Sequence, residues 1–310
     1  MPFEFSRSRA PGTTDGYERM WRDFTTFCAK IDACPMPASP QTVLEFLHFR
    51  EPTHSHSALS WRKNAILAAH KDARASLPQD KREPYKLDTD DMLKLGWTEI
   101  SRRKGNRHTP RKALTEAQLR EIINHAVDLT TPKGIMDRAF LLVSWNILMR
   151  RSEVAALNVD DIEFRDGLML VHIRKSKTDK AGNGVTLAAA ATGDEMCPVA
   201  AMREWIEKSG ATEGALFCHP RFKRRQRVDN TYGYTIIKSY VAMIGLDPAP
   251  YGHHSCRRGG ITHMNELGID AKSGMAQSRH VTPGVYMGYI ADKEAAKNPA
   301  IRALASRLPA

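Results

Sequence analysis

Apolar residues near the start of the chain recur at the spacing of helices that bury one face. Tyr17, Met20, Trp21, Phe24 and Phe27 lie mostly three positions apart, close to the period of an amphipathic helix. Similar apolar stripes predict further helices from Ser39-Pro40 onward, around Leu59, Ile66 and Ala69, and over residues 90–101. Residues 1–100 are therefore expected to form a small helical domain.

Beyond position 112 the apolar pattern first predicts more helices. Thr115 and Gln118 match a capping box, in which each side chain binds the backbone N–H of the other residue. Residues 135–149 are strongly apolar and are expected to form a core helix. Residues 150–164 are expected to continue as a second helical segment. A second domain therefore begins near position 113.

The period then changes to that of a β-hairpin. Residues 168–178 and 184–190 have the β-branched, apolar character of strands, and a turn with glycines joins them. From Pro198 onward the pattern is again mainly helical. The sequence thus predicts a mainly α protein with a small β-sheet, in which residues 113–310 form an α+β domain.

Residues 101–112, with the sequence SRRKGNRHTPRK, separate the two halves. The segment is basic, contains no acidic residue, and includes Gly105 and Pro110, a composition typical of linkers. It forms either a solvated loop or a strap across a DNA backbone, and we favour the strap because the segment joins two globular halves. Its candidate DNA contacts are Arg102, Arg103, Lys104 and Arg107.

The composition favours a globular protein with a polyanionic partner. Of its 310 residues, 42% are hydrophobic, which argues against disorder. Lysine and arginine number 46 against 35 acids, a net charge of +11, which suits phosphate groups, although surface charge also serves solubility alone. With no bilayer-spanning run and no signal-peptide core, we expect a cytoplasmic protein without a membrane partner, associated with the nucleoid if it is bacterial or from a phage.

Cofactor motifs are missing from the sequence. The five cysteines contain no C-x-x-C pair, which argues against a zinc ribbon, and their odd number favours reduced thiols. Neither G-x-x-x-x-G-K-[ST] nor G-x-G-x-x-G occurs, so nothing indicates a bound nucleotide. We expect an activity that needs no cofactor and no metal.

Four separated segments carry the candidate chemistry: LMRRSEVAAL at 148–157, IRKSKT at 173–178, HSCRRGG at 254–260 and HVTPGVYMGY at 280–289. Each is a weak signal alone, because R-x-S-E and H-x-x-R are common by chance. Their order and spacing in one basic, two-domain chain are far more specific. Together they resemble the motifs of the tyrosine recombinase, or phage integrase, family.

The resemblance implies a fold, an activity and a set of catalytic residues. It implies a helical core-binding domain at residues 1–100 and a catalytic domain with a C-terminal tail helix at residues 113–310. It also implies an enzyme that cleaves and rejoins DNA through a 3′-phosphotyrosyl intermediate. The matching catalytic positions are Arg150, Lys177, His254, Arg257, His280 and Tyr289, with Glu153 in a supporting role.

These residue types suit an attack on a phosphodiester. The guanidinium groups of Arg150 and Arg257 are always charged and can bind the non-bridging oxygens, which gain charge in the transition state. His254 and His280 can donate hydrogen bonds there or handle the tyrosine proton. A tyrosine hydroxyl is a weak nucleophile, and nearby cations favour its ionised form.

The resemblance assigns the remaining roles. Lys177, on the hairpin, is the candidate general acid for the leaving 5′-oxygen, and Glu153 is expected to orient the cluster rather than react. The covalent link to Tyr289 conserves the energy of the phosphodiester, so neither ATP nor metal is required.

Neighbouring residues compete for these roles, because such side chains more often pack in cores or form surface ion pairs. The motif alignment favours Arg150 over Arg151, His254 over His253 and Tyr289 over Tyr286. It also favours Lys177 over Lys175 and Lys180. A metal site at His254 and Cys256 is disfavoured by its spacing and ligand count.

The sequence departs from the usual motifs and adds a second basic segment. Arg151 replaces an apolar residue, and Arg279 stands where glycine is typical. Residues 221–227, RFKRRQR, either contact a DNA backbone or form a solvated loop, and we favour the contact. The candidate DNA contacts there are Arg221, Lys223, Arg224 and Arg225, with Arg62 and Lys63 as weaker candidates in the first domain.

The main hypothesis is site-specific recombination of double-stranded DNA by a homo-oligomer, expected to be a tetramer on two sites. A topoisomerase-like or telomere-resolving enzyme would share the active site without joining two sites, whereas a DNA-binding protein without catalysis needs no aligned tyrosine. After Tyr289, Pro299 can begin a helix with Ile301, Leu304 and Leu308 on one face. This tail helix is expected to pack either on its own domain or on a neighbouring protomer.

Overall fold

The computed structural model of the chain describes residues 3–6, 8–105, 110–176, 179, 182–219 and 226–289. The chain divides into two compact units, Met1–Thr109 and Pro110–Ala310. Each unit has a hydrophobic core of its own.

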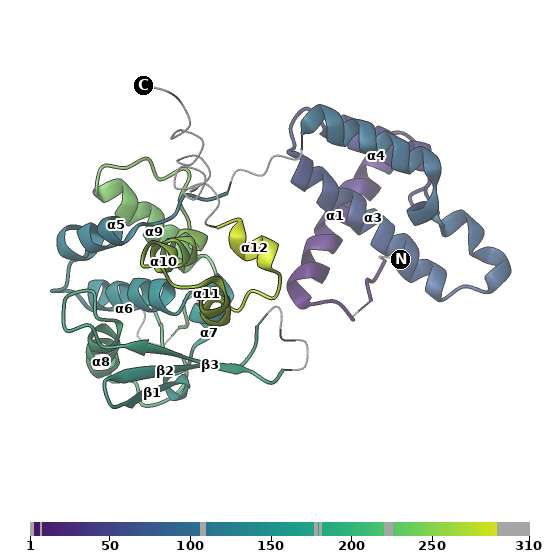
Figure 1. The fold of residues 1–310 in the computed structure, drawn as a ribbon. Coiled ribbons are helices and arrows are strands. Elements are labelled where there is room, and N and C mark those ends of the chain that lie inside the picture. Colours follow the sequence, from purple (N-terminus) through teal and green to yellow (C-terminus); the bar gives the residue numbers. More distant parts are fainter. Residues whose placement is uncertain are drawn as a thin grey trace, which may run out of the picture. The chain divides into compact units, whose positions relative to one another are not determined.

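The first unit is helical, with α1 (Pro11–Lys30), α2 (Pro40–Arg50), α3 (His56–Ala75) and α4 (Asp91–Lys104) (Figure 1). Between α3 and α4 lie the short 3₁₀ helices η1 (Gln79–Lys81), η2 (Glu83–Tyr85) and η3 (Leu87–Thr89). Ser39, Ser55 and Asp90 begin helices, since each side chain accepts a hydrogen bond from a backbone N–H three residues later.

Aromatic side chains fill the core of this unit. Phe24 of α1 and Phe46 of α2 are fully buried, and their ring centroids lie 5.2 Å apart. Leu59 and Ile66 of α3 and Ile100 of α4 complete the contact between the helices. The apolar stripes of the sequence thus mark the faces that the helices turn inward.

The linker prediction was wrong at its first residues. Residues 101–104 form the last turn of α4, which ends at Gly105 with a φ of 66°. Arginine and lysine are good helix formers, and their charges interact favourably with the carboxyl end of a helix. Arg102, Arg103 and Lys104 therefore lie on a helix, and Arg107 lies outside the described residues.

The second unit combines helices with one small sheet. In chain order its elements are α5 (Glu116–Glu121), the π-helical turn η4 (Ile122–Ala126), α6 (Pro132–Asn146), α7 (Arg151–Ala156), the 3₁₀ helix η5 (Val159–Asp161), β1 (Ile162–Arg165), β2 (Leu168–Ile173), β3 (Val185–Ala190), α8 (Pro198–Ser209), α9 (Tyr232–Met243), α10 (His254–Glu266), α11 (Ala271–Ser278) and α12 (Pro283–Met287). Thr115 and Gln118 form the expected capping box at the start of α5.

The sheet is antiparallel in the order β1-β2-β3. Strands β2 and β3 are the predicted hairpin, but β1 replaces the end of the helical segment that we predicted over residues 150–164. Asp166 and Gly167, both with positive φ, form the two-residue connection between Arg165 of β1 and Leu168 of β2, which pair with each other. Asp-Gly is a strong hairpin signal, so the sequence itself indicates a hairpin between β1 and β2.

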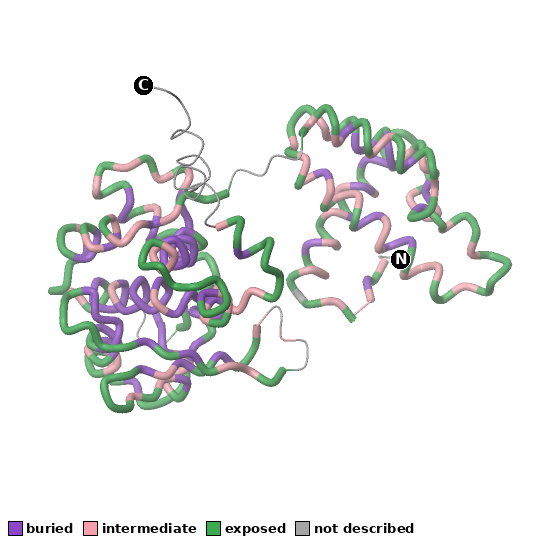
Figure 2. The backbone as a smooth tube through the Cα atoms, viewed as in Figure 1, coloured by how far each residue is buried: buried purple, intermediate pink, exposed green. Residues whose placement is uncertain are grey.

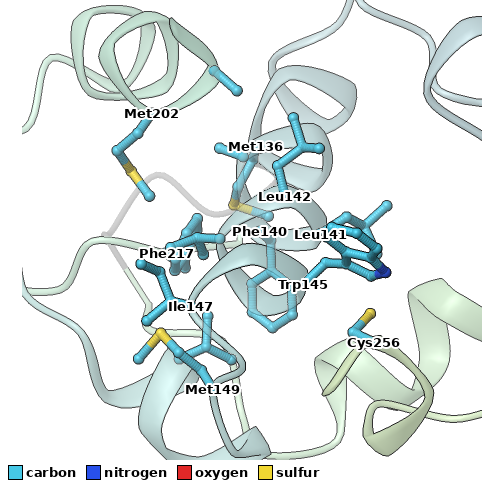
Figure 3. Packing of buried hydrophobic residues seen from close by; sticks show 14 of the residues in the cluster. Met136, Phe140, Leu141, Leu142, Trp145, Ile147, Met149, Met202, Phe217 and Cys256 are labelled. Carbon is cyan, nitrogen blue, oxygen red and sulfur yellow. The ribbon is translucent and has the colours of Figure 1, made fainter. Parts of the chain in front are cut away.

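Helix α6 runs through the middle of the second unit (Figure 1) and is almost entirely buried (Figure 2). Figure 3 shows Phe140 and Trp145 of α6 among the apolar side chains of the core, which include Phe217 and Cys256. The Trp145 indole N–H donates to the carbonyl oxygen of Leu114 over 3.0 Å, so its polar atom is satisfied within the core.

The chain leaves α6 earlier than the apolar run predicted. The helix ends at Asn146, and Leu148 has a φ of 56°. This left-handed residue turns the backbone away from the helix axis, because a right-handed helix cannot continue through it. The turn places Arg150 directly before α7.

The described residues are mostly helical with one small three-stranded sheet, which confirms the predicted mainly α fold class. None of their helices is long and apolar enough to cross a membrane.

Candidate active site

One cavity in the second unit brings together three of the four motifs, those at 148–157, 254–260 and 280–289. It has a volume of about 850 Å³. Five of the predicted catalytic residues line it, from the chain before α7, from α10 and from the segments after α11 and α12: Arg150, His254, Arg257, His280 and Tyr289. Arg111, Arg151 and Arg279 also line the cavity, so its wall is strongly basic.

Arg150 is held at the start of α7 by the buried carboxylate of Glu153. Glu153 accepts one hydrogen bond from the Arg150 backbone N–H and one from Arg150 Nη1, both 2.8 Å long. Burial raises the pKa of Glu153, but the bond from Arg279, its charge and the bonds from Arg150 outweigh burial and leave the pKa lowered. Glu153 is therefore an ionised anchor for Arg150.

Arg257 of α10 is almost completely buried. Its Nη1 donates to the carbonyl oxygen of Leu148 and its Nη2 to the carbonyl oxygen of Ser278. Burial, and then the positive charges of Arg150 and Arg279, lower its pKa to about 10, so the group stays charged near neutral pH. These two hydrogen bonds fix the plane of the Arg257 guanidinium group before any substrate binds.

His280 follows the end of α11 and is oriented by two neighbours. Its Nε2 lies 3.3 Å from Arg257 Nη2, and its Nδ1 lies 2.8 Å from the Ser278 hydroxyl. Because a guanidinium N–H only donates, Nε2 accepts, and we assign the ring proton to Nδ1. Burial, and then the charge of Arg257, lower the His280 pKa to about 4, which fits a neutral ring near neutral pH.

Tyr289 faces the cavity and contacts the motif histidines. Its hydroxyl oxygen lies 2.7 Å from His254 Nε2, and its ring centroid lies 5.0 Å from that of His280. The Arg258 guanidinium lies 5.7 Å from the centre of the same ring. A phenol beside a histidine in a basic cavity is a candidate nucleophile.

Tyr286, the competing tyrosine, has a different environment. It is 1% exposed and packs with Leu148 and Ile261 in a small apolar cluster. A Cβ added to Gly274 would lie 1.9 Å from its hydroxyl, so this glycine makes room for the phenol. The structure therefore places Tyr286 in the core.

The other competing residues are also located. His253 is 5% exposed, and its Nε2 lies 3.3 Å from the carbonyl oxygen of Met149. Burial lowers its pKa to about 4. Lys175 is exposed, while Lys177 and Lys180 lie outside the described residues.

The predicted DNA contacts differ in their surroundings. Arg62 Nε donates to Asp23 over 2.9 Å and is largely buried, and Lys63 Nζ lies 4.5 Å from the Trp97 ring. Arg103 forms an ion pair with Glu51. Arg221, Lys223, Arg224 and Arg225 lie outside the described residues.

Two contributors were missed as site residues. Arg279 binds Glu153, and Arg258 lies over the Tyr289 ring. Their signal in the sequence is weak: Arg279 stands out only as a departure from glycine, and Arg258 follows Arg257 with no motif role of its own. Arg227, at the end of the second basic segment, instead donates to the carbonyl oxygens of Ala155 and Leu157.

Comparisons with known proteins identify the family of this chain. A sequence model of the phage integrase family matches residues 112–295. An integrase/recombinase described as a XerD homolog, from Selenomonas ruminantium, is 26% identical over 288 residues, which cover 92% of this chain and 82% of that protein. The tyrosine recombinase XerC of Herpetosiphon aurantiacus is 33% identical over 164 residues, which cover 52% of this chain and 49% of that protein.

Solved structures show the same fold. A XerH site-specific recombinase in a post-cleavage complex with a palindromic difH substrate aligns with a TM-score of 0.73 at 15% identity, covering 95% of this chain and 80% of that one. The Tn1549 transposon integrase in complex with transposon right-end DNA aligns with a TM-score of 0.64 at 16% identity, covering 96% and 95%. The family match spans more than half of the chain, and this protein therefore belongs to the phage integrase family of tyrosine recombinases, enzymes that cleave and rejoin DNA.

Proposed function

We propose that this chain exchanges strands between two DNA sites, with Tyr289 as the nucleophile. The observation that carries the proposal is the 2.7 Å contact between the Tyr289 hydroxyl and His254 Nε2, in a cavity that Arg150 and Arg257 also line. A nucleophile, a base and cations suited to a phosphate therefore share one cavity.

The proposed chemistry needs only groups of the protein and the DNA. The Tyr289 oxygen attacks the scissile phosphorus, and its proton passes to His254 Nε2. Arg150 and Arg257 donate to the non-bridging oxygens as charge develops on them. The bond from phosphorus to the 5′-oxygen breaks, and that oxygen takes up a proton. The 5′-hydroxyl of a partner strand then reverses the step and releases Tyr289.

A covalent adduct should form in the presence of EDTA and without nucleotide. One phosphodiester is exchanged for another of similar energy, and arginines take the place of a Lewis-acidic metal. The DNA site is identified by sequencing the DNA that remains bound to the denatured full-length protein, and adduct formation on that site is followed by denaturing electrophoresis. Dependence of the cleavage step on added magnesium would contradict the mechanism.

Lys177 is the proposed general acid for the 5′-oxygen. It lies outside the described residues, but the preceding residue, Ser176, has its hydroxyl 3.4 Å from Arg150 Nη1. The Lys177→Ala variant should therefore cleave normal DNA slowly. It should recover on DNA with sulfur at the bridging 5′ position, because a thiolate leaves without a proton. Equal defects on the two substrates would assign the proton to another donor.

The working assembly is proposed to be a tetramer on two DNA sites. A cavity of about 350 Å³ in the second unit is lined in part by Leu148, Met264 and Leu267, and Leu267 is 66% exposed. Such a cavity suits the apolar face proposed for the tail, residues 299–310, of a neighbouring protomer. Head-to-tail contacts of this kind can close a ring.

Deletion of residues 299–310 should separate DNA binding from assembly. The truncated protein should fold and bind a single DNA site, but it should lose the two-site complex and recombination. Gel mobility on one-site and two-site DNA measures both properties. Recombination at the rate of the full chain would exclude the tail as an assembly element, and failure to fold would mean that the tail packs on its own unit.

The proposed DNA contacts include the basic segment 221–225 and the end of α4. In the first unit they include Arg62 and Lys63. Arg62 lines a groove with Arg19, Arg22, Arg50 and Asp23, and Asp23 pairs with Arg50 and Arg62. The salt dependence of DNA binding measures how many such contacts form.

We also propose that the four motifs are particularly similar to those of the phage recombinase Cre. The protein is proposed to act in the cytoplasm, where the DNA substrate of a bacterial or phage enzyme lies.

A further inference from the structure

Arg279 occupies a backbone position that favours glycine. It follows α11 directly, with φ 57° and ψ 41°. In this left-handed region a Cβ is unfavourable, so glycine is the usual residue after a helix. The backbone here is therefore less favourable for arginine than for glycine.

The side chain of Arg279 connects two motifs that lie far apart in the sequence. Its Nη2 donates to Glu153 Oε2 over 2.9 Å, and the two side chains are 11% and 2% exposed. The same Oε2 atom accepts the backbone N–H of Arg150, and Oε1 accepts Arg150 Nη1. One carboxylate thus joins the residue before His280 to Arg150 at the start of α7.

The contact with Glu153 is the main interaction of this guanidinium group among the described residues. Its Nη2 also lies 3.4 Å from the Leu148 carbonyl oxygen, whereas Nε and Nη1 are buried without a hydrogen-bond partner. Hydrogen bonding alone does not account for a buried arginine with two unpaired nitrogens. The positive charge that Arg279 places beside the buried carboxylate of Glu153 accounts for its position better.

Loss of the positive charge of Arg279 would also affect the position of Arg150. Burial raises the pKa of Glu153, and the bond and charge of Arg279 are the largest of the effects that oppose it. A protonated Glu153 would hold Arg150 less firmly, because a neutral acid is a weaker acceptor than a carboxylate. Ionisation of Glu153 and placement of Arg150 are therefore linked through Arg279.

We propose that Arg279 is a positioning residue for catalysis, which keeps the Glu153 carboxylate charged and so holds Arg150 in place for the scissile phosphate. The inference rests on the proposed function, because Arg150 is taken to bind that phosphate. It assigns a role to the residue that stands where the family motif typically has glycine.

The pH dependence of adduct formation tests this role. The full-length Arg279→Gly variant relieves the backbone strain and removes the charge, whereas Arg279→Lys keeps the charge. Without the charge the Glu153 pKa should rise, so Arg279→Gly should begin to lose activity at a higher pH than the wild type, approaching about tenfold per pH unit below the new pKa. It should recover at alkaline pH. Wild type and Arg279→Lys should keep their rates to lower pH.

Matched variants separate positioning from simple packing. Arg203→Ala removes an exposed arginine of α8 and should leave the pH profile unchanged. If Arg279→Gly fails to fold, Arg279→Gln, which is polar but uncharged, takes its place beside Arg279→Lys. A wild-type profile in the uncharged variant, or a defect of equal size at every pH, would overturn the inference. Absence of an adduct with the wild-type protein would instead overturn the proposed function.

Discussion

Replacement of Tyr289 by phenylalanine should abolish the covalent protein–DNA adduct and leave DNA binding unchanged. The substitution removes one oxygen, the atom that lies 2.7 Å from His254 Nε2, and leaves the ring that contacts His254 and His280. No other hydroxyl is expected to replace it as the nucleophile. Denaturing electrophoresis measures the adduct, and a mobility shift at equal protein concentration measures binding.

Tyr286→Phe is the matched control, because it removes the same atom from a tyrosine three positions away. The Tyr286 hydroxyl packs beside Gly274 in the core, so its loss should lower stability slightly and leave adduct formation within a fewfold range of wild type. The opposite pattern, in which Tyr286→Phe alone abolishes the adduct, would reverse the assignment of the nucleophile.

The two tyrosines show where sequence reasoning reached its limit. Positions three apart lie on neighbouring sides of a helix, so periodicity alone would place Tyr286 and Tyr289 together. Helix α12 ends at Met287, and the chain turns at Gly288. Tyr286 therefore lies inside the apolar cluster, while Tyr289 packs on the edge of that cluster and lines the cavity. Only the family motif distinguished them in the sequence.

Other parts of the site depended on contacts between distant segments. The motifs named Arg150 and Arg257, but no spacing predicts that Arg257 donates to the Leu148 carbonyl oxygen, which a left-handed backbone turns toward it. The Asp-Gly turn at Asp166 was a local signal that we missed, whereas the left-handed conformation of Leu148 has no local signal. Local propensities thus predicted most elements, and tertiary contacts decided the geometry of the site.

Arg257→Lys should reduce the rate of adduct formation by about 10²–10³-fold, the range observed when one donor to a developing oxyanion is removed. Lysine keeps the charge, but an ammonium group lacks the planar fork that binds two carbonyl oxygens and still faces a phosphate. The defect should therefore appear although the net charge of the cavity is unchanged. Single-turnover cleavage of the trapped site measures it.

The same change should also lower stability, and the two effects must be measured separately. Arg257 is 2% exposed and satisfies the carbonyl oxygens of Leu148 and Ser278. A carbonyl left without a donor in the core costs about 1–3 kcal/mol, which a shift of the urea midpoint reports. Cleavage is then compared below the unfolding transition of the variant. Arg258→Lys, which keeps a cation near the Tyr289 ring, should have a much smaller effect on the rate. Equal defects in Arg257→Lys and Arg258→Lys would mean that the basic cavity acts through its total charge and not through the fixed guanidinium of Arg257.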